Sequence, residues 1–173
     1  MDLSSISFAA MTPEYAGQIL QWKYGGEYSI YDRHESIAGN GMDDLACVAS
    51  GGALVGWIHF GEPARIPTVE ENVYDDGFLD VGFGLRPELC GKGLGLTFVR
   101  AALEYAQKEF GAKRFRLSVA AFNERARKVY ARAGFVVERE ITNSYFNNKY
   151  YLMKSVGNPA FRIKHYTDEE QHI

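Results

Sequence analysis

The sequence has few of the features that mark export, membrane insertion or nucleic-acid binding. It opens MDLSSISF, without a basic segment followed by a long apolar stretch, so we expect no signal peptide. The longest uncharged run, residues 45–61, is too short and too rich in glycine for a good transmembrane helix. The net charge of −3 provides no general attraction for nucleic acid. We therefore expect neither membrane nor nucleic acid as a partner, and an anionic ligand would need a local binding feature.

Cysteine is also scarce. Cys47 and Cys90 are the only two in 173 residues, and their spacing is not that of a metal site. Free thiols suit a reducing compartment, so we expect a cytoplasmic protein without a bound metal. The hydrophobic fraction of 46% and the charged fraction of 24% are typical of a soluble globular protein. We expect a single domain over residues 1–173, with a core at about 4–156 and a polar tail at 157–173.

Hydrophobic periodicity and turn residues predict a mixed α/β chain. The predicted strands cover residues 4–10, 45–50, 53–60, 78–85, 114–120, 135–142 and 149–154. The predicted helices follow Thr12 to about residue 24, run from 93 to 110, and follow Asn123 to about residue 133. The aromatic and polar stretch after the first helix is expected to be a loop or a short helix.

The turn between the strand at 78–85 and the next helix is unusually rich in glycine. Gly91, Gly93 and Gly95 alternate, with Lys92 between the first two. Glycine costs about 1 kcal/mol relative to alanine inside a helix, so these positions need bare backbone. Unpaired N–H groups and the dipole at a helix start suit a phosphate, and glycine lets its oxygens approach closely. The alternative is a tight turn without a ligand, and the spacing is neither a P-loop nor G-x-G-x-x-G.

A second motif lies downstream, in VAAFNERARKVYARAGFV, which places Asn123, Ala126, Tyr130 and Gly134-Phe135 at fixed offsets. Together the two motifs resemble the GCN5-related N-acetyltransferase (GNAT) family, most strongly from about residue 78 to 135. The family's acyl-CoA signature, Gln/Arg-x-x-Gly-x-Gly/Ala, corresponds to Cys90–Gly95. The resemblance implies an α/β GNAT fold: a mostly antiparallel, splayed central sheet flanked by helices. Acyl-CoA would bind at the strand-turn-helix after the fourth strand.

The resemblance also implies roles for individual residues. The backbone of Phe83 and Leu85 would contact the pantetheine arm and thioester of acetyl-CoA. The pyrophosphate would lie on the backbone amides of a continuous run: Cys90, Gly91, Lys92, Gly93, Leu94, Gly95 and Leu96. Asn123 would contact the arm or cap its helix, and these roles are compatible. Cys90 stands where the signature has Gln or Arg, and a backbone contact would survive that change.

Acetyl transfer in this family is a direct attack of an amine on the thioester, and Tyr130 would be the general acid for the leaving thiolate. The alternative for Tyr130 is a core aromatic at helical spacing. The general base is less obvious, because Ser118 stands where some members have glutamate. Asp80 and Glu62 are the candidates, either directly or through water, and each could instead be an ordinary solvated carboxylate.

The first predicted helix and the loop after it would form a wall of the acceptor site. This stretch contributes the aromatic residues Trp22, Tyr24, Tyr28 and Tyr31. The acids Glu27, Asp32 and Glu35 lie among them or close by, and such a set suits a cationic amine. Ordinary packing of these aromatics is the alternative, and His34 is expected to be a loop residue rather than a ligand.

The sequence therefore predicts an N-acetyltransferase that uses acetyl-CoA as co-substrate. Its acceptor would be a small-molecule amine, such as an aminoglycoside-like compound, or a peptide N-terminus. A non-catalytic acyl-CoA-binding sensor or interaction module is the alternative. A phosphate or nucleotide binder of another fold is disfavoured because the P-loop and dinucleotide patterns are absent. The oligomeric state is left open, a homodimer included.

Overall fold

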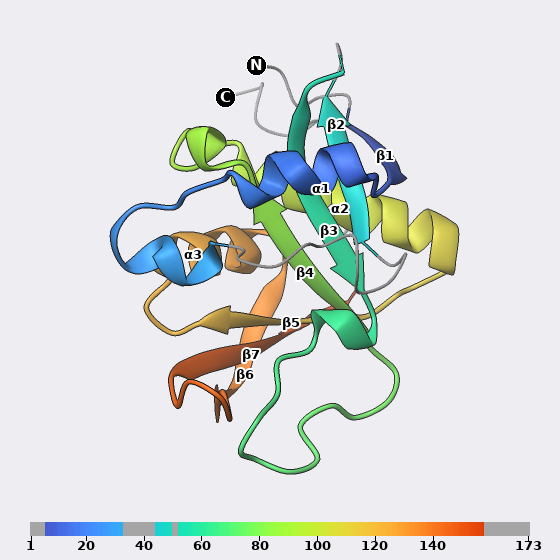
Figure 1. Ribbon diagram of the computed structural model, residues 1–173. Helices are drawn as coiled ribbons and strands as arrows, with labels where there is room; N and C mark the ends of the chain where they lie inside the picture. The colour runs from blue at the N-terminus through green and yellow to red at the C-terminus, as the bar shows by residue number, and fades with distance from the viewer. Residues whose placement is uncertain (1–5, 33–43, 50–51, 158–173) are drawn as a thin grey trace, which may run out of the picture. The chain divides into compact units, whose positions relative to one another are not determined.

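The computed structural model describes residues 6–32, 44–49 and 52–157 (Figure 1). These residues fall into two compact units. The first unit holds the chain up to Arg65 together with Asp80–Phe98, and the second holds Ile66–Leu79 and the chain from Val99 onward. The boundary passes through one long helix, so that its first turn belongs to the first unit and its remainder to the second.

The first unit contains four antiparallel strands in the order β1-β2-β3-β4. Their bounds are β1 Ile6–Ala10, β2 Asp44–Ala49, β3 Leu54–Phe60 and β4 Leu79–Leu85. Two pairs in the β3–β4 register matter for function: Trp57 stands opposite Gly84, and His59 stands opposite Gly82. Side chains of paired residues share one face of a sheet, so this face of β4 carries no side chain at either position.

Helix α1 (Pro13–Leu20) begins as its sequence predicts. Thr12 is the N-cap, its hydroxyl accepting from the Tyr15 N–H at 3.2 Å, and Pro13 takes the first helical position. The helix and the residues after it bury three side chains against β2 and β3, and Figure 1 shows α1 crossing these strands. The buried cluster is Ala16, Ile19, Trp22, Ala46, Val48 and Leu54.

Two 3₁₀ turns flank the strand pair, and a third precedes the long helix. They are η1 (Gly26–Tyr31), η3 (Glu62–Ala64) and η4 (Pro87–Leu89), and helix α2 runs over Gly95–Phe110. The predicted helix start at residue 93 is wrong by two residues, because Gly91 and Gly93 have φ values of 73° and 76°. These are left-handed conformations that an α-helix excludes. In the first turn of α2, the Phe98 ring lies edge-on to Phe83 with centroids 6.3 Å apart.

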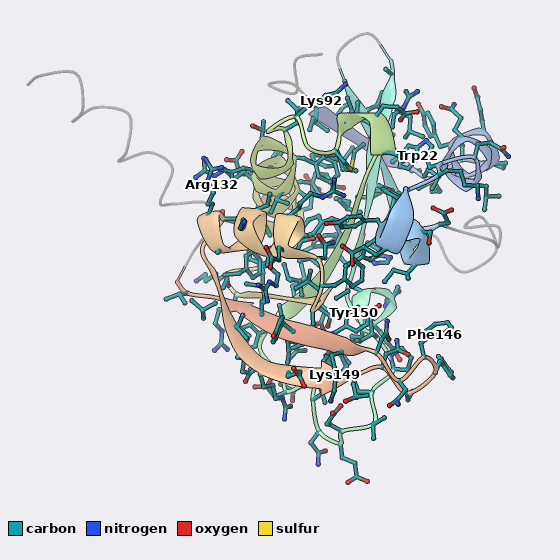
Figure 2. The ribbon with its side chains drawn as sticks, turned by 90° about the vertical axis from the view of Figure 1, so that its left-hand side faces the viewer. Trp22, Lys92, Arg132, Phe146, Lys149 and Tyr150 are labelled. Atoms are coloured by element: carbon teal, nitrogen blue, oxygen red, sulfur yellow. The ribbon has the colours of Figure 1, made fainter. Side chains whose placement is uncertain are left out.

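The second unit contains three antiparallel strands in the order β5-β7-β6, with helix α3 connecting β5 to β6. Their bounds are β5 Phe115–Ala120, α3 Glu124–Arg132, β6 Phe135–Thr142 and β7 Lys149–Ser155. The predicted N-cap of α3 is confirmed, since the Asn123 side chain accepts from the Ala126 N–H at 3.0 Å. Figure 2 shows Phe146 at the tip of the turn between β6 and β7.

Polar contacts tie the segment before β4 to the strands of this second unit. The Glu70 carboxylate accepts from the Thr142 N–H and from its hydroxyl, both at 2.8 Å. Arg116 on β5 is fully buried and pairs with Asp75 at 2.6 Å, with its guanidinium over the Tyr74 ring. A buried arginine needs such partners, because an unpaired charge away from water is very costly. The segment therefore has a defined path although it contains no regular strand.

The mixed α/β architecture predicted from sequence is confirmed, and seven strands are found within the described residues. The stretch after the first helix is the short helix η1, whereas His34 and Glu35 lie outside the described residues. Of the polar tail, only Gly157 is described. No helix in the described ranges is both long enough and apolar enough to cross a membrane.

Acid titration tests the Glu70 contact. Hydrogen bonding to the backbone N–H of Thr142 is the main cause that lowers the pKa of Glu70 below its ordinary 4.5. Ionised Glu70 therefore stabilises the folded state above pH 4.5, and this contribution is lost as the pH falls through the lowered folded-state pKa. We expect Glu70→Gln to reduce the free energy of unfolding above pH 4.5, with the difference from wild type shrinking at lower pH.

Urea denaturation at a series of pH values measures this difference. Glu71→Gln is the matched control, because Glu71 is an exposed neighbour of the same type. A constant difference between wild type and Glu70→Gln across the acid range would contradict the assigned contact.

Candidate functional site

The turn between β4 and α2 has the geometry of an anion cradle. Gly91 and Gly93 both take positive φ, and a Cβ built on either would meet no heavy atom within 4 Å. Both residues and Lys92 between them are exposed. Glycine is thus required by the backbone conformation, and the space in front of it is open. The first amides of α2 follow directly, where partial positive charge is concentrated.

Charged side chains around this turn are of both signs. Figure 2 shows Lys92 at the turn before α2. Arg86 pairs with Glu88 at 3.0 Å, with both side chains exposed. The backbone N–H of Glu88 is the main cause that lowers the pKa of its carboxyl group, and Arg86 and Lys92 act in the same direction. The half-buried Cys90 thiol lies 3.6 Å from the Arg86 carbonyl oxygen, so it points back at the chain.

The backbone of β4 presents alternate residues to its two sides. In an antiparallel pair, successive residues point their N–H and C=O groups toward the partner strand and then away from it. The Asp80 carbonyl accepts from the Gly61 N–H at 2.9 Å, on the β3 side. By this alternation the backbone groups of Phe83 and Leu85 point away from β3. This is the orientation that an extended acyl-CoA arm beside β4 would need.

Tyr24 anchors the loop after α1 to the end of β4. Its hydroxyl donates to the Leu85 carbonyl at 2.8 Å, and its N–H donates to Asp32 at 2.8 Å. Its ring packs edge-on against Tyr31, with centroids 6.2 Å apart. The Leu85 carbonyl, expected to be available to the acyl-CoA arm, therefore already accepts one hydrogen bond. A carbonyl oxygen has two lone pairs, so a second donor can still be accommodated.

The aromatic residues predicted for the acceptor wall divide into two groups. Trp22 is 8% exposed and packs in the core beneath α1, so packing alone explains its position. Tyr28 and Tyr31 are half-buried on η1, with Tyr31 held by Tyr24. The structure thus brings Tyr24 and Tyr31 together at the end of β4, and it places Trp22 elsewhere.

The rings of Trp57 and His59 lie across β4. They are half-buried on one face of β3, and their planes meet at 67° with centroids 4.8 Å apart. A Cβ on Gly84 would overlap Nε1 of Trp57, and a Cβ on Gly82 would overlap Nε2 of His59. Only glycine on β4 lets the nitrogen-bearing edges of both rings reach over the neighbouring strand.

Asp80 is the first residue of β4 on this same face. It is 2% exposed, and its Oδ2 accepts from Nε of Arg65 at 2.7 Å. The carboxylate is thus covered and ion-paired. A bulky acceptor is therefore sterically blocked from contacting it directly. Glu62, the other carboxylate considered as a base, is exposed on η3.

Asn123 and Tyr130 belong to the second unit. Asn123 caps α3, and Tyr130 is half-buried on this helix with its ring edge-on to Phe135 at 6.2 Å between centroids. These contacts agree with the alternative interpretations of the two residues, a helix cap for Asn123 and a packed aromatic for Tyr130. A second role for either residue stays a prediction from the sequence motif.

The sequence interpretation did not single out Trp57, His59 or Arg65. A signal for the first two was available, because the strand LVGWIHF places Trp57 and His59 two residues apart and the strand LDVGFGL places Gly82 and Gly84 two residues apart. Two glycines spaced this way in a strand mark a face on which neighbouring side chains or a ligand lie close to the backbone. The register that pairs these two strands cannot be read from the sequence of either strand alone.

Comparison with known proteins identifies the family. Residues 6–136 match the acetyltransferase (GNAT) domain. The chain belongs to the GNAT family. An uncharacterised N-acetyltransferase from Bacillus subtilis strain 168, YycN, is 34% identical to it over 82 residues, which are 47% of this chain and 47% of that protein. The match therefore spans about half the length of this curated relative.

Solved GNAT structures share the fold. A GNAT acetyltransferase from Bacillus anthracis superposes with a TM-score of 0.68 at 14% identity, covering 90% of this chain and 97% of its own. A SpeG–hSSAT chimera, a spermidine N-acetyltransferase based on the Vibrio cholerae protein, gives 0.66 at 19% identity, with 88% and 96% covered. The aminoglycoside acetyltransferase AAC(6')-Ib in complex with coenzyme A gives 0.67 at 18% identity, with 92% and 98% covered.

The turn before α2 fits the cofactor of this family. A Cβ on Gly91 or Gly93 would project into open space, which is the kind of space a pyrophosphate would need beside the N–H groups of a helix start. For a metal, by contrast, no group of three or more His, Cys, Asp or Glu side chains suited to binding one occurs among the described residues.

Substitution of a cradle glycine tests this assignment. Gly93→Ala forces a Cβ into the left-handed region, costing about 1–2 kcal/mol of folding stability, and places a methyl group in the open space of the turn. We expect the Kd for CoA, measured by calorimetry, to rise by about tenfold or more, equivalent to about 1.4 kcal/mol.

Gly111→Ala is the matched control. Gly111 follows the opposite end of α2, also has positive φ (65°) and also meets nothing within 4 Å, so alanine there costs similar stability. Its Kd for CoA is expected to equal that of wild type. Equal CoA affinity in the two variants would remove the cradle from the binding site.

Proposed function

We propose that this protein transfers an acetyl group from acetyl-CoA to a primary amine. The observation that carries the proposal is the open, positive-φ glycine turn between β4 and α2 in a chain of the GNAT family. Its geometry suits a pyrophosphate on the first amides of α2. With the phosphates there, the acyl arm would run beside the backbone of Phe83 and Leu85, whose polar groups point away from β3.

The acceptor side supports a cationic amine. Two of the structural neighbours are by name a spermidine N-acetyltransferase and an aminoglycoside acetyltransferase, and both acceptors are amines. In this chain the loop anchored at Leu85 presents Tyr24 and Tyr31 beside Asp32. Aromatic faces and a carboxylate attract an ammonium group. Tyr28 on the same 3₁₀ turn completes the proposed wall, whereas Trp22 is assigned to the core.

In the proposed reaction the amine lone pair attacks the thioester carbonyl carbon, forming the C–N bond, and the C–S bond then breaks. The departing thiolate takes a proton, and the sequence motif assigns this proton to the Tyr130 hydroxyl. Asn123 would contact the pantetheine arm in addition to capping α3. Asp80 could accept a proton only through an intervening water, because its side chain is covered and paired with Arg65.

The alternative is an acyl-CoA-binding module without catalysis. The burial of Asp80 favours it, because the carboxylate considered as a base is held in a structural ion pair. Turnover distinguishes the two functions. We expect purified protein with acetyl-CoA to release CoA thiol in the presence of at least one amine from a panel containing spermidine, kanamycin and a peptide with a free N-terminus.

Mass spectrometry of each reaction should show that the mass of that amine has increased by one acetyl group. Binding of acetyl-CoA without acetylation of any panel member would favour the non-catalytic module. Failure to bind CoA at all would contradict both functions.

Tyr130→Phe tests the general acid. The substitution keeps the ring against Phe135 and removes only the hydroxyl. We expect kcat to fall by about 10²-fold, the low end of the 10²–10⁴ range for a general acid, because solvent can partly replace it. CoA affinity should change little, since the loss is confined to the transition state.

Tyr105→Phe is the matched control. Tyr105 is another half-buried helical tyrosine whose ring lies edge-on to a phenylalanine, Phe110, at 6.3 Å. Stopped-flow or steady-state measurement with the best panel amine compares the two variants. Equal kcat values in Tyr130→Phe and Tyr105→Phe would return Tyr130 to a packing role.

A further inference from the structure

We propose that His59 is the residue that removes the proton from the acceptor amine, and that Trp57 holds the amine beside it. This inference rests on the proposed function and supplies the base that the sequence motifs left unassigned. Trp57 and His59 on β3 and Asp80 on β4 lie on one face of this strand pair.

The His59 ring lies over β4, next to the backbone proposed to hold the acyl arm. Its Nε2 edge lies directly over Gly82, in space that any larger residue would fill. Gly82 precedes Phe83, and one residue of strand is about 3.3 Å long. The imidazole nitrogen is thus placed one residue from the backbone group proposed to lie beside the acyl arm. Histidine is the side chain best suited to exchanging protons near neutral pH.

Trp57 packs against the His59 ring, and the strand that carries both residues is packed on both of its faces. Trp57 packs edge-on against His59 and against the buried cluster beneath α1, so the pair is braced by a helix. On the opposite face, the Phe98 ring fills the position of a side chain at Gly56, where a Cβ would come within 2.6 Å of it. A base positioned by packing needs little reorganisation when the amine arrives.

The charged groups next to His59 on this face are Asp80 and its partner Arg65. Asp80 is its diagonal neighbour on β4 and is paired with Arg65, so these two charges largely offset one another. The covered Asp80 is blocked from a bulky acceptor, whereas the half-buried His59 is partly accessible. On these grounds the histidine, rather than the carboxylate, is suited to contact the amine.

The proton balance of this step is complete. The acceptor arrives as an ammonium ion, attracted to the Trp57 face. Its proton passes to Nε2 of His59, and the freed lone pair forms the C–N bond to the acetyl carbon. The C–S bond breaks with its electron pair on sulfur, the thiolate takes the proton of the Tyr130 hydroxyl, and the second proton lost by nitrogen restores that hydroxyl. His59 then releases its proton to water, so each turnover yields the amide, CoA and one proton.

His59→Gln tests the assignment with the panel amine that has the highest kcat/KM. We expect kcat/KM at neutral pH to fall by about 10²-fold with an unchanged Kd for CoA, and the acidic limb of its pH profile to disappear. In His59→Ala, added imidazole should restore part of kcat, because the space over Gly82 is vacated.

Gly82→Ala is a second variant that leaves the histidine in the chain but displaces its ring, and it should lower kcat/KM as well. Gly17→Ala is its control, since Gly17 is an exposed α1 residue with nothing within 4 Å. If His59→Gln fails to fold, the Gly82→Ala profile decides the question.

Two results would overturn the assignment while leaving acetyl transfer intact. One is a folded His59→Gln protein with the wild-type kcat/KM and pH profile. The other is a loss of activity with an unchanged profile and no imidazole rescue, which would show a packing role. If the wild-type protein acetylates no amine of the panel, the proposed function itself is rejected instead.

Discussion

Strand β4 lacks side chains at Gly82 and Gly84, and the packing of much of the first unit depends on this absence. The two positions let the edges of the His59 and Trp57 rings cross from β3 onto β4. Trp57 is in turn packed against the cluster beneath α1, so this helix, the ring pair and β4 form one continuous packing arrangement. A Cβ on β4 at either position would overlap a ring atom, so the rings would have to move, and close-packed interiors leave little room for such a shift.

The turn after β4 also depends on glycine, here because of the backbone conformation. Gly91 and Gly93 are needed for their left-handed conformation rather than for packing, since the space around them is open. Their conformation delays the start of α2 until Gly95. Phe98, one turn further on, packs on Gly56 and Phe83 and so fixes the helix start to the strands. A rigid helix start beside a glycine turn is what close approach of a phosphate requires.

Buried ionic contacts hold the irregular segments of both units. Asp80 secures Arg65 just after η3 in the first unit, and Arg116 secures Asp75 in the second. Each joins one almost fully buried charge to a more exposed partner. Such pairs contribute less to net stability than their short distances indicate, because desolvation offsets the attraction. Their main effect is to define where a loop lies, since removal of one partner would leave a buried charge without its counterion.

Local sequence was sufficient for most of the secondary structure, and two local motifs carried the resemblance to the family. Alternation, caps and glycine stops identified the seven strands and three α-helices of the described residues, since these signals act between residues close in the chain. The glycine turn was recognised for the same reason, although the positive φ of Gly93 moved the helix start. Tertiary structure decided three further features: Trp22 is a core residue, Arg65 covers Asp80, and the His59 ring crosses β4. Each joins residues from different elements, and strand register and helix packing, which no local pattern contains, decide which of them meet.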